Sequence, residues 1–245
     1  MNMKMKTLSL AVLGLAGLAF AGSASADCVA GNLSAWSSTS ALLGTITVAT
    51  GGLETSPQSE CRLDTSLSNN PGSTAFVRDN TPAAEARYRA QFLIDTTPTG
   101  ALTGLESVKI YGAATDTAAN GRTELVKLTI FGDAITPGVK LLGISAACGT
   151  APTFLCASNT PLAAGVNRIE IDWNKSANSL KVWVNSTVEG TVTKTLPLVN
   201  LSAWTGIDYT TLGLAVASPA FLTGHANQVI KFDRFDSRRQ TFIGN

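Results

Sequence analysis

Residues 168–173 have the sequence RIEIDW and residues 180–185 have the sequence LKVWVN, and these two stretches decide the fold. In both, apolar and polar side chains alternate, which is the period of a strand with one buried face. The polar residues 174–177, NKSA, have a common length for a hairpin loop. The two stretches therefore predict an antiparallel β-hairpin.

The alternation also predicts a register for this hairpin. We expect Trp173 to pair with Asn178, which places Ile171 opposite Leu180 on the apolar face. A shift by one residue would set the apolar face against a polar one, so such a shift is excluded.

The polar face of the same hairpin carries the predicted binding residues. The register places Glu170 opposite Lys181 as an ion pair and Arg168 opposite Trp183 as a cation–π contact. With Asp172, these polar groups flank an aromatic surface, an arrangement that suits a hydroxyl-rich ligand. The alternative is that a loop covers this face and Trp183 fills part of the core.

The same period of two recurs along most of the chain, and no long helical stripe follows residue 26. Alternating or apolar strand-like stretches lie at 45–48, 84–94, 105–111, 126–130, 138–144, 190–196, 212–216 and 228–235. Polar and glycine-containing residues between them, including 96–104 and 112–121, are predicted loops. Many short strands separated by turns predict an all-β, two-sheet antiparallel sandwich.

Two stretches carry a resemblance to a known family. Residues 168–185 resemble a paired-strand element of concanavalin A-like and laminin G-like domains, and residues 232–239, FDRFDSRR, resemble the closing strand of exported bacterial proteins of this sandwich type. The resemblance implies a concanavalin A-like jelly roll. It does not choose among functions, because such domains include lectins, adhesive modules and glycosidases.

The catalytic patterns of this fold class are incomplete. Laminarinase-type glycoside hydrolases use a strand with the pattern E-x-D-x-(x)-E, but here Glu170 and Asp172 are followed by Asn174 and Lys175. A neutral amide cannot protonate a leaving group in that role. The single histidine, His225, lies in a predicted solvated loop, and no G-x-S-x-G motif is present. We therefore expect no catalytic residues and no enzyme activity.

Composition excludes further classes of function. A formal charge of +1 on 245 residues lacks the excess of positive charge that nucleic-acid-binding proteins carry. A hydrophobic fraction of 44% is too high for a disordered chain. One histidine excludes a multi-histidine metal site, and we expect no cofactor. Calcium binding stays open without an assigned ligand set, since no D-x-D-x-D/N-G loop exists. The aspartates near turns or the C-terminus are Asp64, Asp79, Asp116, Asp133, Asp233 and Asp236.

The N-terminus predicts export. Lys4 and Lys6 precede the apolar residues 8–21, and residues 24–26, ASA, form a cleavage signal. Removal of residues 1–26 would leave 27–245 as a single sandwich domain, with a net charge of +1 − 2 = −1. A membrane anchor is disfavoured because the apolar run is short. We therefore expect a secreted or periplasmic protein without a membrane span.

The four cysteines predict two disulfides. An even number of cysteines in an exported chain indicates disulfide bonds. Because each pair closes a local, turn-rich segment, we expect Cys28–Cys61 and Cys148–Cys156. A lipid on Cys28 is the alternative for that residue, but a lipobox has a small residue where this chain has Asp27.

Together these features predict a non-catalytic exported module that recognises a glycan or another extracellular macromolecule. The alternative is a structural surface or matrix protein that self-associates, which a mean hydropathy of +0.19 and a charged fraction of 14% would permit.

Overall fold

The computed structural model of the chain describes residues 31–54, 61–119, 122–149 and 155–244. The predicted signal peptide and its cleavage position lie outside the described residues. Its strands are β1 (Ser38–Ser40), β2 (Gly44–Thr50), β3 (Cys61–Leu67), β4 (Ala75–Asp79), β5 (Arg87–Asp95), β6 (Ser107–Ala119), β7 (Arg122–Gly132), β8 (Lys140–Ala147), β9 (Leu155–Pro161), β10 (Val166–Asn174), β11 (Ser179–Val184), β12 (Lys194–Pro197), β13 (Tyr209–Leu214) and β14 (Ile230–Arg238). Its short helices are η1 (Thr97–Thr99), η2 (Leu201–Ala203) and α1 (Pro219–Gly224).

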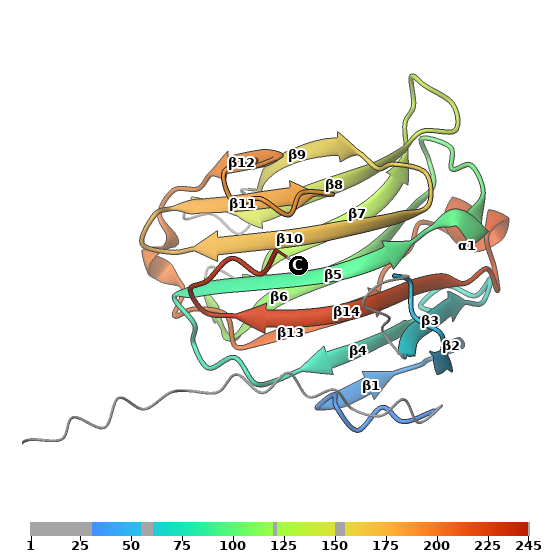
Figure 1. Ribbon diagram of the computed structural model, residues 1–245, viewed down its shortest axis with the longest axis horizontal. Coiled ribbons are helices and arrows are strands. Elements are labelled where there is room, and N and C mark those ends of the chain that lie inside the picture. Colours follow the sequence, from blue (N-terminus) through green and yellow to red (C-terminus); the bar gives the residue numbers. More distant parts are fainter. Residues whose placement is uncertain (1–30, 55–60, 120–121, 150–154, 245) are drawn as a thin grey trace, which may run out of the picture.

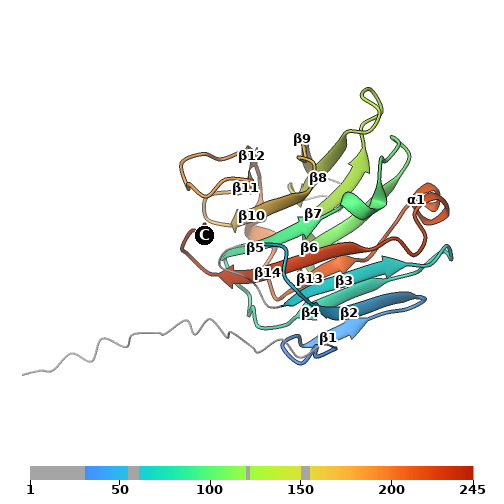
Figure 2. The ribbon, with the colours of Figure 1, turned by 45° about the vertical axis from the view of Figure 1, so that its right-hand side comes forward.

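The strands form two antiparallel sheets that pack face to face, as the alternation predicted (Figures 1 and 2). Sheet 1 has the order β1-β4-β13-β6-β7-β8-β9, and sheet 2 has the order β12-β11-β10-β5-β14-β3-β2. The fold class predicted from the sequence, an all-β sandwich, is confirmed. Within the described residues, no helix has the length and apolar character needed to cross a bilayer.

The core lies between the two sheets and consists of the inward-facing half of each alternating strand. Phe92 of β5 stacks on Tyr111 of β6, with ring centroids 5.6 Å apart, and so joins the two sheets. Phe232 of β14 adds a tilted contact to Phe92 at 6.2 Å. Burial of Tyr111 raises the pKa of its hydroxyl well above the ordinary value. These aromatic side chains supply much of the buried apolar area that stabilises the sandwich.

The β10–β11 hairpin forms, but its register differs from the prediction by two residues. Trp173 pairs with Leu180 and Ile171 pairs with Val182, so the loop comprises residues 175–178. Asn178 adopts a left-handed conformation with φ of 47°, which asparagine tolerates better than most residues. A shift of two residues keeps every side chain on its predicted face but changes which residues are opposite each other.

This shift removes the two contacts predicted on the polar face. Lys181 lies opposite Asp172 and Trp183 lies opposite Glu170. The expected Glu170–Lys181 ion pair and Arg168–Trp183 cation–π contact are therefore wrong.

Most of the segment predicted as a loop at 112–121 is strand. Its residues up to Ala119 belong to β6, which pairs with β7 on one side and with β13 on the other. The run of Gly, Ala and Thr lacks large side chains that alternate with polar ones, so no pattern in these residues indicates a strand. The β6–β7 pairing contains register shifts, the first between Lys109 and Tyr111, and such bulges re-aim side chains on a sheet surface.

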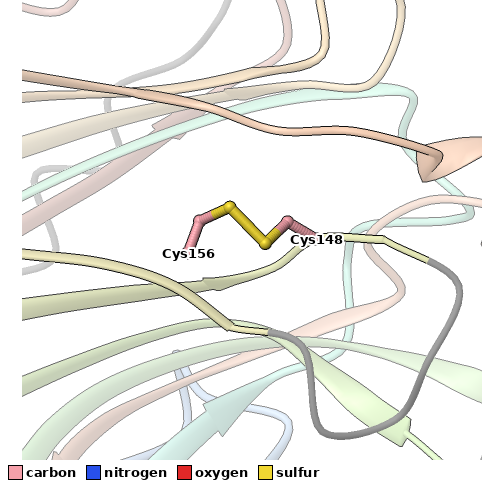
Figure 3. Close-up of a disulfide and its surroundings, with 2 residues drawn as sticks. All are labelled: Cys148 and Cys156. Atoms are coloured by element: carbon pink, nitrogen blue, oxygen red, sulfur yellow. A yellow bond between two sulfur atoms is a disulfide. The ribbon is translucent and has the colours of Figure 1, made fainter.

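One of the two predicted disulfides is described in full. Cys148 and Cys156 are bonded across the loop from β8 to β9, with their Cα atoms 5.7 Å apart (Figure 3). A loop this short limits the entropic stabilisation to about 2–3 kcal/mol. Cys61 at the start of β3 is also disulfide-bonded. Its predicted partner, Cys28, lies outside the described residues.

Candidate functional site

The outer face of sheet 2, where the binding residues were predicted, is closed. After β14 the chain turns back and ends over β10 and β5 (Figure 1). We call residues 239–244 the C-terminal segment. Trp183 is only 1% exposed, its ring lies 5.3 Å from that of Phe242, and its Nε1 donates a hydrogen bond to Glu189 O at 3.0 Å. The expectation that Trp183 forms an exposed platform is therefore wrong.

The charged side chains under this cover form an ion-paired cluster. Arg89 Nη2 lies 3.0 Å from Asp172 Oδ2 and 2.6 Å from Glu189 Oε1, and Arg89 Nη1 lies 3.8 Å from Glu170 Oε1. Arg87 binds Asp172 through two hydrogen bonds of 3.0 and 2.8 Å. We call these five side chains the closed cluster. Its members Arg89, Glu170 and Asp172 are buried, so each charge depends on its partners rather than on water.

The C-terminal segment binds this face through backbone groups and one ring. Glu170 accepts hydrogen bonds from the N–H groups of Ile243 at 2.9 Å and Gly244 at 3.1 Å. Gly244 O accepts from Arg168 Nη1, and also from Gln91 at 2.6 Å when the Gln91 amide nitrogen faces this oxygen.

Burial of Glu170 dominates its titration. It raises the pKa of the carboxyl, and the N–H groups of Ile243 and Gly244 and the charge of Arg89 only partly oppose this effect.

Of the five predicted site residues, the structure brings four under or beside the C-terminal segment. Glu170, Asp172 and Trp183 are buried there, and Arg168 reaches both Gly244 O and Glu54. Lys181 is exposed, and the described part of the chain offers it no ion pair. Sequence alternation thus found one face of the hairpin correctly but could not show that another segment covers it.

The outer face of sheet 1, in contrast, carries an open groove that the sequence analysis missed. Two adjoining hollows of about 360 and 230 Å³ share Lys109 and Glu124. The groove crosses β4, β13, β6 and β7. Its other charged lining residues are Arg78 and Lys127, and its uncharged lining residues include Phe76, Ser107, Thr129, Tyr209, Thr211 and Ser218.

A glycine positions the central lysine of this groove. Lys109 of β6 is ion-paired with Glu124 of the neighbouring strand β7. A Cβ atom at Gly112 would lie 2.8 Å from Lys109 Nζ and 3.0 Å from Thr211 Oγ1, so any larger residue at this position would require the end of the lysine side chain to shift. The alternation of Lys127 with Val126 and Leu128 was the available sequence signal for this outward face.

An aromatic side chain borders the cationic part of the groove. The Arg78 guanidinium carbon lies 3.5 Å from the centroid of the Tyr209 ring, a cation–π contact. Arg78 also donates to Asn80 Oδ1 at 2.6 Å and lies 3.4 Å from Asp116. These contacts fix the guanidinium beside the ring at one end of the groove.

The single histidine is buried rather than solvated in a loop. His225 follows α1, with its Nε2 3.2 Å from Glu106 Oε1 and its Nδ1 3.0 Å from Gln228 Oε1. Burial alone would raise the pKa of Glu106, but hydrogen bonds from Thr103 and His225 outweigh it and lower that pKa. This pair links α1 to the loop before β6.

The calcium binding that the sequence left open gains no support from the described residues. In the parts of the chain that the structure describes, no three His, Cys, Asp or Glu side chains are grouped so that they could hold a metal ion. Asp233 instead accepts a hydrogen bond from Leu53 N at 2.7 Å, and Asp64 pairs with Arg62 at 2.8 Å.

Comparison with known proteins shows the fold but no family. No family model and no curated protein matches the sequence. The fold is similar to that of a carbohydrate esterase from a Shiga toxin-encoding bacteriophage, phi24B, at 13% identity over 83% of this chain and 90% of that chain, with a TM-score of 0.53. It is also similar to an alginate lyase from Pseudomonas aeruginosa, at 14% identity over 73% of this chain and 82% of that chain, with a TM-score of 0.51.

A third solved structure of similar fold is the binding domain of botulinum neurotoxin serotype D/C, at 11% identity over 82% of this chain, with a TM-score of 0.51. This chain spans 44% of the length of that chain and 44% of a further receptor binding domain. All of these neighbours are all-β sandwiches.

These neighbours correct one expectation. The sandwich fold is shared with a lyase and an esterase, so the prediction that the chain is not an enzyme is overturned. At identities of 13% and 14%, the likeness extends to the fold and not to any particular reaction.

Proposed function

We propose that this protein is an exported, concanavalin A-like glycan-binding protein that takes an acidic polysaccharide in the groove on sheet 1. The observation that carries the proposal is the charge of the groove lining. Three cationic side chains, Arg78, Lys109 and Lys127, and one anionic side chain, Glu124, line the groove and give 3 − 1 = +2. Asp116, which pairs with Arg78 outside this lining, reduces the local excess to 2 − 1 = +1.

The chemistry of the lining suits a uronate polymer. Lysine and arginine donate charge-assisted hydrogen bonds to carboxylates. The threonine and serine hydroxyls between them can meet sugar hydroxyls, and the Tyr209 ring offers an apolar edge. The larger hollow, about 360 Å³, falls within the usual range for small-ligand sites. Export is supported by the Cys148–Cys156 disulfide, since such bonds persist outside the cytosol.

Isothermal titration calorimetry with alginate oligosaccharides tests the proposal. We expect binding that weakens as salt is added, and no binding of uncharged dextran. Lys109→Ala/Lys127→Ala should weaken binding about a hundredfold or more, because two charge-assisted hydrogen bonds are lost and each is worth about 1.5–3 kcal/mol. Lys181→Ala, which removes an exposed lysine from the other sheet, is the matched control and should leave binding unchanged.

The same samples separate binding from turnover and from assembly. An increase in new chain ends during incubation with alginate would assign an enzyme activity to the groove. Light scattering of the free protein over a concentration series tests self-association. Equal binding by the double variant and Lys181→Ala would remove the groove from consideration.

A further inference from the structure

We propose that the C-terminal segment is a built-in ligand, which occupies a second saccharide site on the outer face of sheet 2 and is displaced by a neutral saccharide. This site is separate from the groove on sheet 1 and does not depend on the function proposed for it. The inference rests on how the segment is held, on what it leaves unsatisfied, and on the groups that it contacts.

The C-terminal segment is not part of the sheet that it covers. Pairing of β14 with β5 ends at Arg238, and in the described chain no backbone–backbone hydrogen bond involves residues 239–244. The segment is held by side chains of sheet 2 and, at its first residue, by an ion pair of 2.7 Å between Arg239 Nε and Glu85 Oε1, and its residues Gln240 and Thr241 are exposed. It can therefore leave the face without breaking a strand ladder.

The closed state leaves polar groups unsatisfied. Nε and Nη1 of Arg89 are buried and find no hydrogen-bond partner among the described residues, although the side chain is only 2% exposed. The Arg89 guanidinium faces the covering segment, since its central carbon lies 5.8 Å from the Phe242 ring centroid. A cover that served stability alone would be better placed over apolar residues, because buried charges are costly. The unpaired donors favour a ligand that brings more acceptor oxygens than the segment does.

The contacts of the segment describe the ligand that could replace it. Two adjacent hydroxyls of a sugar can donate to the two oxygens of Glu170, as the N–H groups of Ile243 and Gly244 do. A further sugar oxygen can accept from Arg168 and Gln91 in place of Gly244 O. The apolar face of the sugar ring can pack on Trp183 in place of Phe242.

The charge balance of this face points to an uncharged ligand. Around the C-terminal segment, the ion-paired cations Arg87, Arg89, Arg168 and Arg234 are balanced by the anions Glu54, Glu170, Asp172 and Glu189, which gives 4 − 4 = 0. The exposed Lys181 adds one positive charge outside these pairs. The paired groups under the segment thus offer no excess charge to attract an acidic polymer.

A truncated chain that ends at Arg239 tests the proposal. We would measure its binding, and that of the full chain, to maltohexaose, cellohexaose and mannohexaose. We expect the truncated chain to bind at least one of these saccharides at least tenfold more tightly than the full chain does. In the full chain only the molecules with the segment displaced can bind, so the apparent affinity is the intrinsic affinity multiplied by the fraction of such molecules. Glu170→Ala in the truncated chain should abolish this gain, and a synthetic peptide of residues 239–245 should compete with the saccharide.

A full-length variant provides the same test if the truncated chain does not fold. Phe242→Ala removes only the ring on Trp183 and should also strengthen saccharide binding, whereas Gln240→Ala/Thr241→Ala, at exposed positions, should not. The proposal is overturned if folded truncated protein binds the peptide but none of the three saccharides, or if Phe242→Ala binds them no better than the parent chain. Loss of alginate binding would bear on the groove alone, so the two proposals fail separately.

Discussion

The two outer faces of the sandwich use similar side chains in opposite ways. On sheet 2, Arg89 and Glu170 are buried under the C-terminal segment and depend on each other, while on sheet 1 Lys109 and Glu124 line an open groove. The difference lies in the cover and not in the strands. A polar strand face is therefore part of the protein interior where another segment covers it, and it is accessible to a ligand where no segment does.

The largest contrast is expected for the aromatic side chains of the two faces. Trp183→Ala should cost about 3–5 kcal/mol, because truncation of a buried tryptophan leaves a cavity. In a domain of this size, at about 2–4 °C per kcal/mol, that lowers the melting temperature by roughly 6–20 °C. Tyr209→Ala in the open groove should cost about 1–2 kcal/mol, the value of a half-buried ring with one cation–π contact. Thermal melts of both variants measure this; equal shifts would contradict the assignment of closed and open faces.

The second largest contrast is expected for the stability cost of replacing a charged side chain on each face. Arg89→Met keeps the volume of the side chain but leaves Glu170 and Asp172 with fewer partners in a buried site, which should cost about 3 kcal/mol. Lys109→Met removes one partner from a pair that water can reach, so its cost should stay below about 1 kcal/mol. Urea unfolding gives both values. A stability loss for Lys109→Met that matches Arg89→Met would show that the groove, too, is structurally closed.

The smallest effect is a dependence on pH. Because burial raises the pKa of Glu170, the folded state binds its proton more tightly than the unfolded state does. The contribution of Glu170 to stability therefore falls as the pH rises from the ordinary carboxyl range through the raised pKa. Glu170→Gln removes this titration, so the stability of the parent relative to the variant should decrease from pH 4.5 to pH 8. Denaturant unfolding across this range measures it, and an increase with pH would contradict the burial of the carboxylate.

The sequence predicted many of the strands, but not β1, β3, β4 and β9, and it did not predict the contacts between strands. Alternation such as Ile169, Ile171 and Trp173 identifies a half-buried strand, because the buried face needs an apolar residue at every second position. It cannot distinguish registers that differ by two residues, since both keep the same faces. The loop at 175–178, with Asn178 in a left-handed conformation, decided the register, and polar loop residues alone did not specify which four would form it.

The candidate sites were harder to predict, for two physical reasons. The closing residues Arg239, Gln240 and Thr241 are polar, so nothing local indicated that Phe242 and Ile243 would fold back over β10. The groove combines residues from β4, from the consecutive strands β6 and β7, and from β13, three parts of the chain that are distant from one another, and it depends on pairing between β13 and β6. Neither kind of long-range arrangement leaves a periodic signal in a single sequence.

A substitution at Gly112 could change which ligands the groove accepts, although the charged residues of the groove stay the same. Replacement by alanine would place a methyl group 2.8 Å from Lys109 Nζ and 2.9 Å from its Cε, and the flexible end of the lysine would have to move. That movement would change where the ammonium group lies relative to Glu124 and to a ligand in the groove. A residue without a functional group thus helps to determine the position of a charge in the groove.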